Sequence, residues 1–299
     1  MCIHMLCAKF SRIEEESLNS SEADTFQDPV DETLHNALKT ALKREVSDWN
    51  AVLDKWSKTY ELRRKESQTL NACEFLQEWP KYTDSRAVDL IKLDFTIAYP
   101  GKESILLSKW DNFKKKIVIY YKENIHNATC KHLLEQVQSA ESIDSSDYII
   151  TALLPSVLPS NSWHSSKSKT SRTRVTLLDS QESLVLRLDT IGDYERKVNN
   201  LICKNYGNSN TLQPFIIVEG VNSNDIKSFF VYFDKTIYKL DSFIDCLDVC
   251  FKLFNTLNLH YPIASKFPWL FIQKYFYEID TPYDVKSANL TALLSFMRK

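Results

Sequence analysis

Cysteine and histidine side chains, which can bind metal ions, cluster at three places in the chain. Cys246 and Cys250 are one helical turn apart, so both thiolates could face one metal ion. They alternate with Phe243, Leu247 and Phe251, and a cysteine in such surroundings usually acts as a small buried hydrophobe. The other two clusters are His126, Cys130 and His132, and Cys2, His4 and Cys7. Because neither has the ligand pattern of a zinc site, we predict no metal and no cofactor.

Carboxylates near the ends of predicted strands could support a different chemistry. Metal-dependent cleavage of nucleic acids needs acidic side chains that converge on one or two ions. The candidates are Glu219 and Asp234, with Asp94, Asp245 or Asp248 as a third. The chain offers few strands to carry such a site, and Asp245 and Asp248 also suit the polar side of a helix. A divergent metal-dependent nucleic-acid-processing enzyme is therefore our alternative hypothesis, with no catalytic residue assigned.

Lysine and arginine side chains form two clusters that could contact phosphate groups. The candidate nucleic-acid contacts are Lys114, Lys115, Lys116, Lys167, Lys169, Arg172 and Arg174. The first three belong to a predicted helix over residues 105–124, and the other four to a serine-rich stretch without acidic residues. If the two clusters share one face, binding to DNA or RNA should weaken with salt. A solvated helix face and a plain linker are the simpler interpretations, and a net charge of −2 gives no general attraction to nucleic acid.

The composition is typical of a helical protein from the cell interior. The 299 residues include 16 Phe, 14 Tyr and 6 Trp but only 4 Gly, which favours helices over a long series of β-hairpins. Seven cysteines occur without a CxxC pair, which predicts reduced thiols in a cytoplasmic or nuclear protein. No apolar run is long enough to cross a membrane, and the apolar residues 1–8 are too short for the core of a signal peptide.

Changes in composition divide the chain into four regions. Residues 1–30 are acidic and rich in serine, which predicts a disordered tail. Residues 31–159 follow as a helical region that begins with one long amphipathic helix to about residue 60. Residues 160–178 are predicted to form a flexible, basic, serine-rich loop. Residues 179–299 are the predicted α+β core region, which can form one continuous domain with residues 31–159.

The C-terminal third has the densest apolar sequence and is predicted to form the core. Residues 215–218 predict a buried strand, and residues 229–240 predict a hairpin that turns at Asp234 and Lys235. Residues 179–202, 243–259 and 269–279 have apolar residues at helical spacing. We therefore predict an α+β fold, mostly helical, with a small antiparallel sheet at about residues 214–240 packed against the C-terminal helices.

Several short motifs, taken together, resemble one group of proteins. The C-terminal motifs are Leu154-Pro155, Leu158-Pro159, residues 212–218 (LQPFIIV), residues 238–262 (YKLDSFIDCLDVCFKLFNTLNLHYP), residues 269–273 (WLFIQ) and Tyr283-Asp284. The earlier ones are Leu90-Ile91, Asp94-Phe95, Tyr99-Pro100 and Trp110. The chain resembles a large uncharacterised group that is abundant in arthropods and fish, some of whose members are labelled sterile alpha motif domain-containing protein 3-like. Such proteins are often multi-copy and similar to the cargo of mobile elements, which implies a nuclear or nucleic-acid context by association only.

These observations favour a binding protein over an enzyme. The resemblance implies no activity, and its motif residues are mostly apolar. We expect a non-catalytic intracellular protein that acts in binding or assembly and is linked by the resemblance to mobile elements. Its partner would be a protein, or a nucleic acid bound through the basic clusters, and not a membrane.

Overall fold

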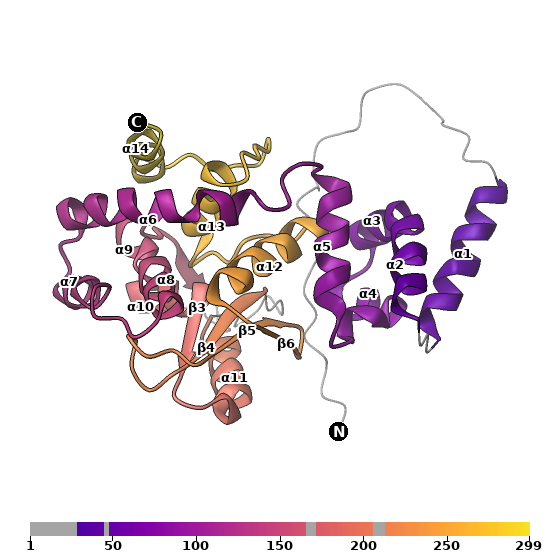
Figure 1. Ribbon diagram of the computed structural model, residues 1–299, viewed down its shortest axis with the longest axis horizontal. Coiled ribbons are helices and arrows are strands. Elements are labelled where there is room, and N and C mark those ends of the chain that lie inside the picture. The colour runs from indigo at the N-terminus through magenta and orange to yellow at the C-terminus, as the bar shows by residue number, and fades with distance from the viewer. Residues whose placement is uncertain (1–28, 45–47, 166–171, 206–212) are drawn as a thin grey trace.

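Helices make up most of the computed structural model, and one four-stranded sheet lies among them (Figure 1). The structure describes residues 29–44, 48–165, 172–205 and 213–299. The predicted acidic tail, residues 1–30, lies outside these ranges except for the first two residues of the first helix. The fold is α+β and mostly helical, as the sequence predicted.

The first helices pack at one end of the molecule, on the right in Figure 1. They are α1 (Pro29–Lys43), α2 (Trp49–Lys58), α3 (Tyr60–Thr69), α4 (Ala72–Glu78), the 3-10 helix η1 (Pro80–Thr83) and α5 (Ala87–Ala98). The prediction of a single long helix up to about residue 60 is wrong, because a separate helix, α2, begins directly after Asp48. The Asp48 side chain accepts a hydrogen bond from the N–H of Asn50 at 3.0 Å, which caps α2.

The middle of the chain is a second set of helices. They are α6 (Ile105–Asn124), α7 (Ala128–Glu135), α8 (Ile143–Ala152) and the short α9 (Leu154–Val157). The bounds of α6 are those predicted from its apolar spacing, and Leu106, Trp110, Phe113 and Ile117 form its buried face. This face lies against α13 (Lys266–Tyr275), since the rings of Phe113 and Phe271 are 5.9 Å apart.

The sheet has the strand order β3-β4-β5-β6. Its strands are β3 (Val185–Leu188), β4 (Phe215–Glu219), β5 (Ser228–Phe233) and β6 (Thr236–Leu240). The predicted antiparallel unit is confirmed as β4-β5-β6, and Asp234 and Lys235 form its tight turn with φ of 41° and 71°. The fourth strand, β3, pairs with β4 in parallel, so the sheet is mixed.

Strand β3 corrects the helix predicted over residues 179–202. In the structure this segment contains α10 (Leu177–Leu184), then β3, the 3-10 helix η2 (Ile191–Asp193) and α11 (Tyr194–Asn205). The side chains of this segment point alternately to the two faces of the sheet, as those of a strand do. Val185 packs into the larger core cluster, whereas Leu186 and Leu188 pack on the opposite face. The helix α11 is the crossover that a parallel β3-β4 pair requires.

Helices cover both faces of the sheet. Ile216, Val218 and Val231 belong to the larger core cluster, together with α12 (Phe243–Thr256). The opposite face, with Ile217 and Phe230, packs against Val198 and Leu201 of α11. The sheet therefore packs on the C-terminal helices, as predicted, and carries an additional helix behind it.

The segment predicted as a basic loop, residues 160–178, contains a small hairpin. Its strands β1 (Trp163–Ser165) and β2 (Arg172–Arg174) pair antiparallel. Thr176 then caps α10 through a reciprocal pair of hydrogen bonds with Asp179. The last helix is α14 (Ala288–Met297). Among the described helices, none combines the length and hydropathy needed to span a bilayer.

Candidate functional site

Three lysines of α6 join this helix to three other parts of the chain. Lys109 donates to the carbonyl of Phe276 at 3.3 Å, just after α13, and Lys116 donates to the carbonyl of Met297 at 3.2 Å, in the last turn of α14. Lys114 forms an ion pair with Asp147 of α8 at 3.0 Å. A cation at the end of a helix complements its terminal carbonyls, so these side chains hold the fold together.

Lys114, one of the predicted phosphate contacts on α6, is half-buried. Burial lowers the pKa of its amine, but hydrogen bonds and ion pairs with Asp147 and Asp111 outweigh it, and the net pKa is raised. Its positive charge is thus already matched by carboxylates. Lys115 is exposed, and no described residue pairs with it.

The remaining predicted contacts belong to residues 167–174 of the chain. Arg174 is exposed at the end of β2 and lines a cleft of about 260 Å³ with Asn127 and Ser180. Arg172 pairs through its backbone with Ser165, but its side chain is outside the described part. Lys167 and Lys169 also lie outside the described residues.

The carboxylates of the alternative hypothesis have separate partners. Glu219 accepts the N–H of Ile191 at 2.9 Å, and Asp245 accepts the hydroxyl of Ser242 at 2.7 Å in the cap of α12. Asp234 lies in the β5-β6 turn, where burial raises its pKa. Within the described ranges, no group of three or more histidine, cysteine or acidic side chains converges as metal ligands would.

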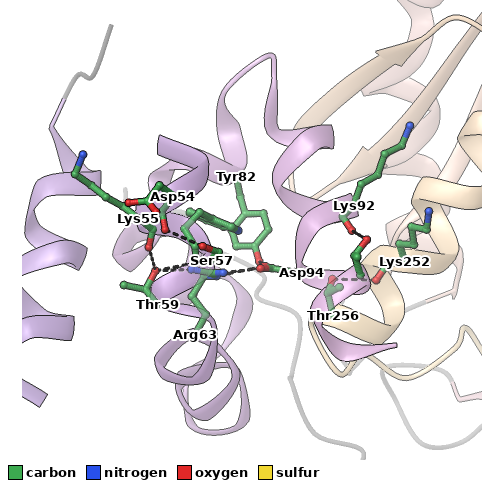
Figure 2. Close-up of polar contacts among 12 residues, drawn as sticks. Asp54, Lys55, Ser57, Thr59, Arg63, Tyr82, Lys92, Asp94, Lys252 and Thr256 are labelled. Atoms are coloured by element: carbon green, nitrogen blue, oxygen red, sulfur yellow. Dashed lines mark hydrogen bonds and ion pairs between the residues drawn. The ribbon is translucent and has the colours of Figure 1, made fainter. Parts of the chain in front are cut away.

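The other two acids are held in buried networks. Figure 2 shows Arg63 and Tyr82 pointing toward Asp94, at 2.5 Å and 2.8 Å from its carboxylate oxygens. Asp248 accepts hydrogen bonds from Lys252 and Tyr277, each at 2.6 Å, and burial raises its pKa. Both acids are almost wholly enclosed, so neither is open to a substrate.

The two cysteines of α12 are part of the core. Cys246 and Cys250 are fully buried free thiols, and burial raises the pKa of each. Among the other thiol and imidazole candidates, Cys130 is buried while His126 and His132 are exposed. The Cys2, His4 and Cys7 cluster lies outside the described residues.

A cleft of about 380 Å³ opens beside β3, and we call it the β3 cleft. Its walls come from α7, α8 and α10, and its rim includes Ser223 of the loop between β4 and β5. Leu133 and Ala152 give it apolar surface, and Leu178 is 56% exposed at its edge. Three residues of β3 also line the cleft, namely Val185, Leu186 and Arg187.

The outer edge of β3 has backbone hydrogen-bonding groups that no described residue binds. The N–H of Gly220 donates to the carbonyl of Leu188 at 2.8 Å, which turns the polar groups of Leu188, and of Leu186 two residues earlier, toward β4. Those of Val185 and Arg187 therefore face the free edge. The Val185 N–H closes α10 on the Gln181 carbonyl, but no described residue bonds the Val185 carbonyl or the N–H and carbonyl of Arg187.

The Arg187 side chain fixes the neighbouring loop. Its guanidinium donates to the carbonyls of Gly220 at 2.8 Å and Val221 at 2.6 Å. Tyr148 lines the same cleft, and burial raises the pKa of its phenol. The charge of Arg187 and hydrogen bonds with Ser223 and Arg187 partly oppose that rise in pKa. The cleft is thus preformed on a rigid frame. The cleft was not predicted from the sequence, because the run Val185 to Leu188 is too short to mark a strand by its pattern.

No protein-family model, curated protein or solved structure matches this chain. The resemblance to the arthropod and fish group therefore stays a prediction.

Proposed function

We propose that this protein is a non-catalytic binding and assembly protein whose β3 cleft holds an extended segment of a partner protein. The observation that carries the proposal is the outer edge of β3, where Arg187 lines the cleft and its N–H and carbonyl have no partner among the described residues. An extended peptide placed there would add a fifth strand to the sheet. Main-chain hydrogen bonds would supply affinity, and alternate side chains would contact Leu178 and Leu133.

The two edges of the sheet differ in a way that supports this proposal. Folded proteins commonly protect an edge strand with lysines or cover it with other elements. At the β6 edge, Lys235 and Lys239 are exposed and the hydroxyl of Tyr238 donates to the carbonyl of Tyr82 at 2.7 Å. The β3 edge instead opens into a cleft with apolar walls. Such an edge suits a peptide that is held in one place.

The cellular setting is part of the same proposal. The described cysteines Cys73, Cys130, Cys246 and Cys250 are all free thiols, which supports a reducing compartment, cytoplasmic or nuclear. A link to mobile elements has only the sequence resemblance in its support. No observation in the described residues favours the nucleic-acid-processing alternative.

The experiment compares two substitutions at one edge position. Peptides of 12 random residues displayed on phage are selected on the protein, and their affinities are measured for Arg187→Ala and Arg187→Pro. Both variants lose the guanidinium, but only proline also removes the N–H that faces the cleft. We expect the selected peptides to bind Arg187→Pro at least about tenfold more weakly than Arg187→Ala, since a buried hydrogen bond is lost.

The exposed Leu178 gives a second variant at the cleft edge. Leu178→Asp should weaken the same peptides without lowering the melting temperature. Failure to select any peptide, or equal affinity for both Arg187 variants, would refute the proposal. Binding of DNA or RNA in a mobility assay, without peptide binding, would favour the alternative.

A further inference from the structure

A second hollow lies on the other side of α7, and we call it the α6–α7 groove. It has a volume of about 470 Å³. Its lining residues are Val118, Tyr121, Lys122 and Ile125 of the α6 side, and Lys131, Leu134, Glu135, Val137 and Gln138 of the α7 side. None of these residues lines the β3 cleft, to which α7 instead presents residues such as Leu133. The helix α7 is therefore a wall shared by two separate surfaces.

The floor of this groove is apolar and incompletely covered. Tyr121 and Ile125 are buried beneath it, whereas Val118, Leu134 and Val137 are only half-buried and pack on the edge of the main core. Within the part of the chain that the structure describes, no further element lies over them. A ligand that adds apolar side chains there would complete the burial of this floor.

The rim of the groove is positively charged. Lys122 and Lys131 are exposed on opposite sides of the floor, and no described residue pairs with either of them. Lys115 lies three residues before Val118 and seven before Lys122, so it shares this side of α6. The only acid in the lining is Glu135, which lies 3.5 Å from the ring of His132. The free charges at the rim thus sum to an excess of cations.

We propose that the α6–α7 groove docks an acidic amphipathic helix of a partner protein. The apolar stripe of such a helix would pack on Val118, Leu134 and Val137, with aspartate or glutamate side chains next to the stripe meeting the rim lysines. The charges make the choice of partner specific, because a basic helix would place cations against Lys122 and Lys131. The apolar floor favours a peptide helix over nucleic acid, whose phosphates gain nothing from it.

The test uses a designed peptide as its probe. An 18-residue fluorescein-labelled peptide carries leucine at positions i, i+3, i+4 and i+7 along one face and glutamate beside that face; its control has lysine at every glutamate. We expect saturable binding of the acidic peptide by fluorescence anisotropy, no binding of the basic peptide, and weaker binding as salt rises.

Substitutions in the groove then locate the binding. The double variant Lys122→Glu/Lys131→Glu should bind the acidic peptide about tenfold or more weakly, and Leu134→Ala should also bind it less well. Lys235→Glu, in the exposed β5-β6 turn, is the matched control and should bind as the unchanged protein does. Circular dichroism melts show whether each variant is folded.

Three outcomes would overturn the inference. These are no saturable binding of the acidic peptide, equal affinity in the folded double variant, and equal binding of the basic peptide. If the acidic peptide fails to bind but a 20-nucleotide single-stranded DNA binds and is weakened by the double variant, the groove binds nucleic acid and the inference is wrong. None of them affects the β3 cleft, whose test uses different peptides and different variants.

Discussion

Arg63 is the clearest case of a charged residue used to hold helices together. Its guanidinium lies 3.9 Å from the ring of Trp56 and pairs with Asp94 of α5, while the Thr59 hydroxyl accepts a further hydrogen bond at 2.6 Å (Figure 2). The charges are enclosed, and each of the three guanidinium nitrogens of Arg63 donates to Asp94 or Thr59. Sequence spacing indicated that Asp94 lies on a helix but could not show which cation it meets, because Arg63 is on another helix.

The substitution Asp94→Ala should destabilise the protein by about 3–5 kcal/mol, because it leaves the Arg63 charge buried and unpaired. Chemical denaturation of both proteins measures this difference. Asp54→Ala is the control, since its exposed pair with Lys58 should contribute less than about 1 kcal/mol. A loss below about 1 kcal/mol for Asp94→Ala would show that the buried pair does not stabilise the fold.

Asp284 should make stability sensitive to acid. Burial raises the pKa of this carboxylate, but Lys274, Thr281 and Gln273 together lower it below its ordinary value of 3.8. A lowered folded-state pKa gives stabilisation that is present above pH 3.8 and is lost as the pH falls through the folded value. Asp284→Asn should therefore cost about 1–3 kcal/mol near pH 7, and this cost should shrink in acid.

Urea unfolding between pH 7 and pH 3 measures the free-energy difference between the two proteins. The free-energy difference between the two proteins should become smaller as the pH falls. A difference that became larger would contradict the lowered pKa of Asp284.

Single elements show how far local sequence determines structure in this chain. The helix α6 has the predicted bounds because its apolar residues recur at helical spacing over five turns. The hydrogen-bond partners of its lysines were not predictable, since the carbonyls that accept from Lys109 and Lys116 are more than 160 residues away in the chain. Strand β3 was missed because four residues are too few to show a period. Its partner strand β4 also lies beyond a helix in the chain.

The loop between β4 and β5 tests the frame of the β3 cleft. A Cβ at Gly220 would lie 2.5 Å from the carbonyl oxygen of Asp225, which is backbone and cannot move away cheaply. Gly220→Ala should therefore destabilise the protein by about 1–3 kcal/mol. At Gly192 the nearest atom to an added Cβ is 3.8 Å away, so Gly192→Ala should be neutral or slightly stabilising. Equal melting temperatures for the two variants would contradict the tight approach at Gly220.

At the scale of the whole molecule, one cluster of buried side chains runs from Leu42 in α1 to Met297 in α14. It includes Trp56 and Trp79 among the first helices and Trp269 of α13. The aromatic C-terminal third does form much of this core, as its composition predicted. The β3 cleft and the α6–α7 groove were not predictable, since a cleft depends on which faces the packing leaves open.

A shared core should make unfolding cooperative across the chain. We expect tryptophan fluorescence and far-ultraviolet circular dichroism to report the same urea midpoint, because tryptophans from both ends of the molecule belong to one cluster. Two separated transitions would indicate that the first helices and the sheet region unfold independently.

Amide hydrogen exchange of residues 186–188 tests the central claim most directly. In the free protein, the N–H groups of Leu186 and Leu188 should exchange slowly because they bond β4, whereas that of Arg187 should exchange fast at the open edge. A peptide selected for the β3 cleft should slow Arg187 to the level of its neighbours. An Arg187 amide that is already as protected as Leu186 and Leu188 in the free protein would show that the edge is closed and would contradict the account.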